Sequence, residues 1–401
     1  MMKKLLTLTT TLTICIAVLC GCRGGGPSSG QRLQNMVDSQ WRQYKGLWPG
    51  LEGGVAMVID TPQGFFFMSS QMPLASLDIH FRAASNTKNF TAAAILLLEQ
   101  RGLLDIEDLI TDLIPGSLDP YVPNTPDYAI PNKSSITIKL LLEHRAGVFD
   151  VDNDRIPPSA PAPYAGLFYV DYVEDDLGQP NHTFTFDELV GVAAANDLSY
   201  FLPDADYHYS NTGYSILGKI IERVSGQAYA DFVQDNLLTP NSLENTSLPA
   251  LGTQQSLPDP FATGYTYLGG VSEETTEDNM SPHVAEGNII TTPRNLVTWV
   301  RRLFRGEAGL DQAKVELMKQ VIPTGDSHLL YGLGCQYTTG LGYGHNGAHA
   351  GYMTVMRYDP VYDVAMVIFT SFLNFDGVLD QILFMYEIGY LARDILGYPR
   401  S

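Results

Sequence analysis

The feature that most constrains the fold is a run of strong helix formers over residues 85–101, followed by Gly102. Residues 92–98 are only Ala, Ile and Leu, so a helix here is apolar on nearly all of its faces. Such a helix has to be buried, and Gly102 provides a natural C-terminal stop. We therefore expect a long helix through the centre of a large core, with Ser85 at its N-terminus.

Composition agrees with a core of that size. The chain has 401 residues, of which 45% are hydrophobic and 17% charged, as in an ordinary globular protein. No long Gly/Ser or Pro tract interrupts the interior, which favours one domain with a substantial insert. The formal net charge is −20 and basic residues do not form long runs, so nucleic acid is not expected as a partner.

The N-terminus has the layout of a secretory signal: two lysines, an apolar and threonine-rich stretch over residues 5–19, and a Gly-rich spacer after Cys22. Residues 19–22, Leu-Cys-Gly-Cys, resemble a bacterial lipobox, whose final Cys receives lipid. We therefore predict a lipoprotein signal peptide over residues 1–21, lipidation of Cys22 and a flexible tether over residues 22–32. The protein would be lipid-anchored in the bacterial cell envelope and face the periplasm or the exterior. A plain signal peptide or an uncleaved anchor is the alternative.

Strand signals gather at the two ends of the chain, and helix signals lie between them. Apolar runs bounded by turn residues predict strands over residues 53–60, 65–68, 79–82, 342–350, 353–358 and 364–369. Periodicity and capping signals predict further helices over residues 33–44, 137–144, 186–195, 214–224, 293–303 and 379–396. The expected domain spans residues 33–397 and has an α/β (α+β) fold. Both chain ends form an antiparallel sheet flanked by helices, with an all-α insert over about residues 105–287.

Ser85 and Lys88 form the first chemical motif. Residues three apart on a helix share a face, so the amine of Lys88 lies beside the hydroxyl of Ser85. A neighbouring amine and the positive end of the helix dipole both favour ionisation of that hydroxyl, and desolvation lets the amine act as a base. Lys88 is the only lysine of the chain with Ser three residues before it. We interpret the pair as nucleophile and base; an exposed helix start is the alternative.

Tyr209 and Asn211 form the second motif, at a junction between a loop and a helix. A phenol can relay a proton between a nucleophile and a leaving group, and an amide can bind a substrate carbonyl. Taken alone, this spacing also fits a capped turn.

The third motif is His345-Asn346-Gly347, in a strand-like segment near the C-terminus. Small residues beside the His allow a substrate backbone to lie against the strand edge as an added strand. His345 and His349 have the spacing of a helical metal pair, but Gly347 argues against a helix and no third ligand is evident. The sequence therefore predicts no metal and no cofactor.

Ser-x-x-Lys, Tyr-x-Asn and His-x-Gly, in this order, resemble the serine β-lactamase and D-alanyl-D-alanine carboxypeptidase family of penicillin-binding protein-like hydrolases, particularly its class C and esterase branch. Residues 81–85, 136–147 and 285–292 resemble it too, so the likeness covers about residues 54–369. The resemblance implies a β-lactamase/transpeptidase-like fold.

The resemblance also implies catalytic roles. Ser85 would be the acylated nucleophile, Lys88 its base or proton shuttle, and Tyr209 the partner acid/base. The backbone amides of Ser85 and Ala348 would form the oxyanion hole.

The implied substrate-binding set is Asn211, His345, Asn346 and Gly347. Asn346 replaces the usual Thr or Ser, which changes how a substrate carboxylate would be recognised. The sequence thus predicts a serine hydrolase that forms an acyl-enzyme at Ser85 and cleaves a small peptide, amide or ester, with a cell-wall peptide as one candidate. Two alternatives stay open: a non-catalytic penicillin-binding sensor or binding lipoprotein, and a true class C-like β-lactamase.

Overall fold

The computed structural model describes residues 27–325 and 329–400. The predicted signal peptide and Cys22 lie outside these residues. Within the described ranges, no helix is both long enough and apolar enough to cross a bilayer.

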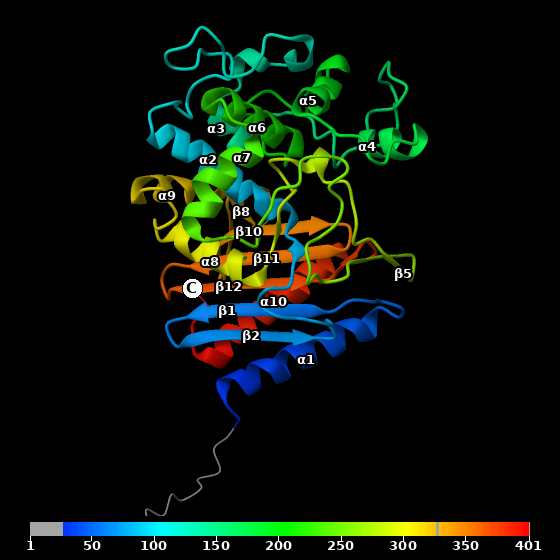
Figure 1. Cartoon of the computed structure of the whole chain (residues 1–401), viewed down its shortest axis with the longest axis vertical. Helices are drawn as coiled ribbons and strands as arrows, with labels where there is room; N and C mark the ends of the chain where they lie inside the picture. Colours follow the sequence, from blue (N-terminus) through cyan, green and yellow to red (C-terminus); the bar gives the residue numbers. More distant parts are fainter. Residues whose placement is uncertain (1–26, 326–328, 401) are drawn as a thin grey trace, which may run out of the picture.

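The main sheet has eight strands and is antiparallel throughout. Its strands are β1 (Val55–Thr61), β2 (Gly64–Ser70), β7 (Ile322–Pro323), β8 (Leu330–Tyr331), β9 (Gln336–Thr338), β10 (Gly342–His349), β11 (Tyr352–Asp359) and β12 (Val364–Thr370). Their order from edge to edge is β2, β1, β12, β11, β10, β9, β8, β7. Because β1 pairs with β12, strands from the two ends of the chain are neighbours, as Figure 1 shows. The predicted sheet built from both chain ends is confirmed.

Both faces of the central strands β1, β11 and β12 are buried, which explains their largely continuous apolar runs. Alternate side chains of a strand point to opposite faces. In β1, Ala56 and Val58 join the core around the central helix, whereas Met57 joins a second core on the other face. The helices α1 (Ser29–Leu47) and α10 (Val378–Leu396) cover this second core and pack on each other.

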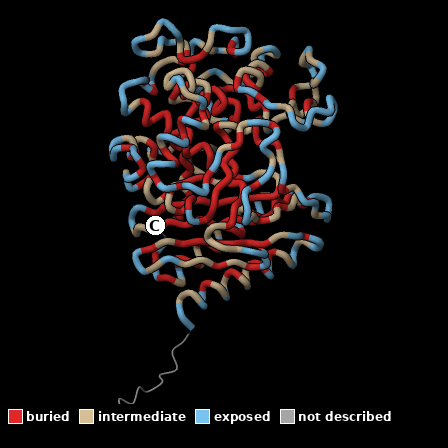
Figure 2. The backbone as a smooth tube through the Cα atoms, in the orientation of Figure 1, coloured by how far each residue is buried: buried red, intermediate tan, exposed pale blue. Residues whose placement is uncertain are grey.

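The predicted central helix is confirmed as α2 (Thr87–Gln100), whose first twelve residues are all buried. In Figure 1 it extends from the sheet into the helical half of the molecule, and Figure 2 shows that the chain there is buried. The helix α8 (Pro293–Phe304) packs against the same face of the sheet, and its Trp299 ring stacks on Phe90 with 4.0 Å between ring centroids. The start of α2 is therefore held rigidly against the sheet.

Apart from α6, which has 15 residues, the other helices and turns have ten residues or fewer. They are η1 (Ala84–Asn86), η2 (Pro126–Tyr128), η3 (Lys133–Ser135), α3 (Ile138–Leu142), α4 (Tyr169–Asp171), η4 (Tyr172–Asp176), α5 (Phe186–Ala195), α6 (Asn211–Ser225), α7 (Tyr229–Val233), η5 (Gln234–Leu238), η6 (Thr239–Asn241), η7 (Ser281–His283) and α9 (Gln312–Met318). Two small sheets complete the fold: β3 (Phe81–Arg82) with β6 (Ile290–Thr291), and β13 (Phe372–Asn374) with β4 (Tyr265–Leu268) and β5 (Val271–Glu274).

The structure departs from the predicted all-α insert at β4 and β5. A Gly269-Gly270 turn, with φ of 61° and 85°, joins them into a hairpin, and β4 pairs in parallel with β13. This pairing ties the insert to the C-terminal part of the chain. A Gly-Gly pair between two short strands is a local hairpin signal.

Two helices begin earlier than predicted, each because a serine caps them. The Ser28 side chain accepts a hydrogen bond from the Gln31 backbone N–H, so residues 29–32 of the predicted tether are helical. The Ser210 side chain does the same for Gly213, so α6 begins at Asn211.

Candidate active site

Ser85 lies in the 3₁₀ turn η1, immediately before α2. Ala84 has φ of 50°, an uncommon conformation for a residue with a side chain, and the turn it makes leaves Ser85 partly exposed. Lys88 is fully buried on α2, and its Nζ donates a hydrogen bond to Ser85 Oγ over 3.3 Å. The two residues meet as the helical spacing predicts.

Tyr209 also contacts Ser85. Its phenol is hydrogen-bonded to the Ser85 side chain, and its ring lies 4.7 Å from Lys88 Nζ. Burial raises the pKa of Tyr209 well above its usual value, so the phenol is neutral. His144 supports the ring from behind, with 4.2 Å between ring centroids, and its Nδ1 accepts the Ser210 backbone N–H at 3.1 Å.

Asn211, the first residue of α6, is buried and lines the same pocket. Its backbone N–H donates to Asp150 Oδ2 at 3.1 Å and its Nδ2 donates to Asp152 Oδ2 at 2.6 Å. Its Oδ1 has no hydrogen-bond partner among the described residues. That oxygen is itself buried.

The edge of β10 forms another wall of the site. The Asn346 N–H donates to the Gln336 side chain at 2.9 Å, so it points away from β11. Along a strand the same direction recurs two residues later, at Ala348, where β9 has already ended. The exposed Ala348 therefore directs its N–H to the free strand edge, on the side where a second donor beside Ser85 would be needed.

Gly347 is the contact between β10 and η1. A Cβ there would lie 2.1 Å from the Ala83 carbonyl oxygen and 2.8 Å from Asn86 Nδ2. Only a residue without a side chain lets the strand approach Ser85 this closely.

The imidazole of His345 is buried, and its Nε2 is 2.9 Å from the Tyr331 hydroxyl. Burial lowers its pKa to about 3, so the ring is neutral at pH 7. Asn346 has both ends of its amide engaged: Oδ1 accepts from Arg357 at 2.7 Å and Nδ2 donates to Tyr386 at 2.7 Å. Arg357 itself is fully buried, beneath the strand.

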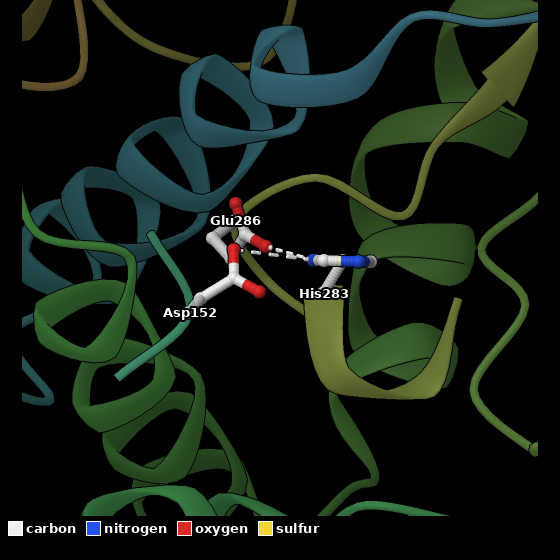
Figure 3. A group of neighbouring side chains, drawn as sticks. All are labelled: Asp152, His283 and Glu286. Atoms are coloured by element: carbon white, nitrogen blue, oxygen red, sulfur yellow. Dashed lines mark hydrogen bonds and ion pairs between the residues drawn. The ribbon is translucent and has the colours of Figure 1, made fainter. Parts of the chain in front are cut away.

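Sequence reasoning missed a chain of charged residues beside Lys88. Besides Ser85, Lys88 Nζ donates to both the backbone oxygen and Oε2 of Glu286, each at 2.9 Å. Glu286 Oε1 lies 2.8 Å from His283 Nδ1, and that nitrogen lies 3.4 Å from Asp152 Oδ2. Figure 3 shows the His283 ring directed at the two carboxylates. Glu286 lies in the family-like stretch over residues 285–292, but nothing local in the sequence points from it to Lys88.

The same three side chains offer one ligand atom each within 4.8 Å of one another, as a metal site would. However, His283 Nδ1 is at hydrogen-bonding distance from both carboxylates, and Glu286 Oε2 already accepts a hydrogen bond from Lys88 Nζ. Burial opposes a charge on His283, but Asp152 and Glu286 outweigh it and raise its pKa well above the usual value. In this structure the three side chains form a hydrogen-bonded chain of charges.

His345 and His349 do not form a metal pair. Four residues along a strand separate them by about 13 Å. His349 Nε2 instead lies 2.7 Å from Asp278 Oδ2.

The pocket that is lined by Ser85, Tyr209, Asn211 and His345 has a volume of about 530 Å³. The polar side of the pocket is formed by Ser85, Tyr209, Asn211 and the chain of charges made by Asp152, His283 and Glu286. None of the described lining residues is Lys or Arg. Its other side, between β10 and α10, is apolar and is formed by Met353, Leu373, Phe375, Val378 and Ile382.

The Beta-lactamase family matches residues 48–382 of the chain. Penicillin-binding protein 4* of Bacillus subtilis is 26% identical over 345 residues, which are 82% of this chain and 69% of that protein. A D-stereospecific amidohydrolase from Streptomyces has the same fold, with a TM-score of 0.73 and 22% identity over 89% of this chain and 98% of that one. D-amino acid amidase from Ochrobactrum anthropi in complex with D-phenylalanine gives a TM-score of 0.71 and 22% identity over 91% of this chain and 99% of that one. Because the family model covers most of the chain, and because Ser85 lines the pocket with Tyr209 and is hydrogen-bonded to Lys88, the chain belongs to the beta-lactamase family of serine hydrolases.

Proposed function

We propose that this protein cleaves an amide, peptide or ester bond through an acyl-enzyme at Ser85, and that it is not an efficient β-lactamase. The observation that carries the proposal is the position of Ser85 Oγ between the Lys88 amine and the Tyr209 phenol, at the mouth of the pocket. This arrangement pairs a nucleophile with a base and a separate acid.

In the proposed reaction, Ser85 Oγ attacks the substrate carbonyl carbon while neutral Lys88 takes the hydroxyl proton. The carbonyl π electrons move onto oxygen, where the Ser85 and Ala348 N–H groups stabilise the charge. The neutral Tyr209 phenol donates a proton to the leaving group as the carbonyl re-forms, and Lys88 returns its proton to Tyr209. Water, activated by the same groups, then cleaves the ester at Ser85.

The pocket favours substrates without a carboxylate at the β10 edge. β-Lactam drugs carry a carboxylate, and the family-related Lys at this position would bind it. Here that position is His345, whose low pKa keeps it neutral, and the pocket contains Asp152 and Glu286. A charge-assisted hydrogen bond contributes about 1.5 to 3 kcal/mol, so its loss weakens carboxylate binding about 10- to 100-fold.

The apolar side of the pocket supports a substrate with a large apolar side chain. A substrate laid along the free edge of β10 places alternate side chains on either face of the strand. One of these faces meets Leu373, Phe375 and Ile382. The structural likeness to D-amino acid amidases agrees with a small aminoacyl amide or peptide of this kind.

The test compares kcat/KM for nitrocefin and for a neutral nitrophenyl ester with an aromatic acyl group, at pH 7 and pH 5.5. We expect the ester to be turned over faster at both values, and Ser85→Ala to abolish turnover. Ser256→Ala, which removes an exposed hydroxyl, is the matched control. Nitrocefin hydrolysis faster than ester hydrolysis at both pH values would make this a true β-lactamase, and a burst that stalls at one equivalent would make it a sensor.

We also propose that the mature protein is lipidated at Cys22 and anchored in the cell envelope. The lipobox-like residues 19–22 and the Gly-rich spacer support this. Mass spectrometry of the protein from a bacterial host should find a diacylglyceryl group on Cys22, absent in Cys22→Ser. An unmodified N-terminus at another residue would contradict the proposal.

A further inference from the structure

We propose that Glu286 is a positioning residue that sets the protonation state of Lys88, and that His283 tunes it through the same carboxylate. The inference rests on the proposed function, in which neutral Lys88 accepts the proton of Ser85. It adds two residues to the reaction that make no contact with the Ser85 hydroxyl.

Glu286 holds Lys88 through both its main chain and its side chain. The backbone oxygen and Oε2 each accept a hydrogen bond from Lys88 Nζ at 2.9 Å, and Ser85 Oγ takes a third at 3.3 Å. These three acceptors account for all the donors of an ammonium group. The exposed fractions of the Lys88 and Glu286 side chains are 0% and 3%, so water screens their attraction poorly.

Glu286 is the nearest counter-charge among several groups around the amine. The other titratable groups that face Lys88 are Asp150, Asp152, His144, His345, Tyr209 and Tyr214. Glu286 is also near His283 and the phenols of Tyr209 and Tyr229. Within the described part of the chain, Lys88 forms an ion pair with Glu286 only.

Two opposing effects set the pKa of Lys88. Burial lowers it, which favours the neutral amine that accepts a proton, and Glu286 raises it. The protonated His283, 2.8 Å from Glu286 Oε1, partly neutralises the carboxylate and weakens its pull on Lys88. Asp152 pairs with His283 and also accepts the Asn211 amide, so the chain of charges links the Ser85-Lys88 pair to the substrate-binding Asn211.

The acid limb of the pH-rate profile is the part in which the rate rises with pH as Lys88 loses its proton. Removing the charge of Glu286 and removing the charge of His283 should move this limb in opposite directions. Glu286→Gln removes the anion that stabilises the ammonium, so the apparent pKa falls and the limb moves to lower pH. His283→Asn keeps a hydrogen-bond donor but removes a cation, so Glu286 stabilises the ammonium more and the limb moves to higher pH. A directly paired charge shifts a pKa by about 1 to 3 pH units, and the farther His283 by less.

The experiment measures the rate of Ser85 acylation by a neutral nitrophenyl ester, from nitrophenol release, across the pH range. It uses the full chain as wild type, Glu286→Gln, His283→Asn and the control Glu244→Gln, which removes an exposed carboxylate. We expect a limb shifted down by about one unit or more in Glu286→Gln, up in His283→Asn, and unchanged in the control. Acylation does not require turnover, so the experiment works for a hydrolase and for a sensor.

Activity losses without a shift of the limb, or shifts in the same direction for both variants, would overturn the inference. Circular dichroism checks folding, and if Glu286→Gln does not fold, the direction of the His283→Asn shift alone decides. A wild-type protein that is never acylated contradicts the proposed function itself. An acylated wild type with unmoved limbs in the variants contradicts only the role of Glu286 and His283.

Discussion

Gly347→Ala tests whether close contact between β10 and η1 builds the oxyanion site. A Cβ at residue 347 would lie 2.1 Å from the Ala83 carbonyl oxygen, whereas side-chain Cβ atoms essentially never approach closer than 3.0 Å. The obstacle is main chain, and the Asn86 amide, which donates to the same oxygen at 2.6 Å, holds it in place. β10 and η1 therefore have to move apart by about 1 Å.

This movement separates the two proposed oxyanion donors, because Ser85 lies on η1 and Ala348 lies on β10. A misplacement of about 1 Å costs on the order of 100-fold in rate, and the loss of one oxyanion donor costs about 100- to 1,000-fold. We expect Gly347→Ala to lower kcat by about 100-fold with a smaller change in KM, since the donors act mainly in the transition state. Overpacking should lower the free energy of unfolding by about 1 to 3 kcal/mol.

The assay is steady-state hydrolysis of the neutral ester, with the melting temperature measured in parallel. Gly46→Ala is the matched control, because Gly46 is an exposed position in α1 with no heavy atom within 4 Å of an added Cβ. It should keep full activity and gain up to about 1 kcal/mol of stability. A folded Gly347→Ala protein whose kcat stays within about threefold of wild type would refute the reasoning.

Three further predictions follow from the site. Ser85→Ala, Lys88→Ala and the double variant should each lose about a thousandfold or more in kcat/KM, to similar extents; losses that multiply would show that the residues act independently. Phe375→Ala should raise KM for the aromatic ester about fivefold, from about 1 kcal/mol of lost apolar contact, and leave KM for an acetyl ester unchanged. Burial opposes the charge on Asp278, but the His349 hydrogen bond outweighs it and lowers the pKa to about 2, below that of the unfolded chain. The Asp278 carboxylate therefore contributes up to about 2 kcal/mol near neutral pH, lost as pH falls from about 4 to about 2, whereas burial lowers the pKa of its partner His349 and so disfavours the charged imidazole. Acid unfolding of Asp278→Asn should lack that dependence, and the control Asp311→Asn, at an exposed position, should keep it.

Much of the fold can be predicted from local patterns. The apolar run of α2, the alternating and continuous runs of β10, β11 and β12, and the Thr292 cap with Pro293 of α8 all lie at or near their predicted places. The predictions were less accurate where a serine caps a helix earlier than the periodicity suggests, and where the β4 and β5 hairpin pairs with a distant strand.

The sequence by itself determined which residues of the three motifs meet. Ser85 in η1 and Lys88 in the first turn of α2 are three residues apart on continuous helical backbone, so their contact follows from local spacing, and the order of the motifs indicates the family. Only the tertiary structure determined which titratable groups lie around these motifs and whether those groups are charged. Glu286 reaches Lys88 across 198 positions in the sequence, and His345 is neutral because neighbouring elements bury it. Protonation depends on desolvation and on through-space charges, which no local pattern encodes, because they arise only when distant segments pack together.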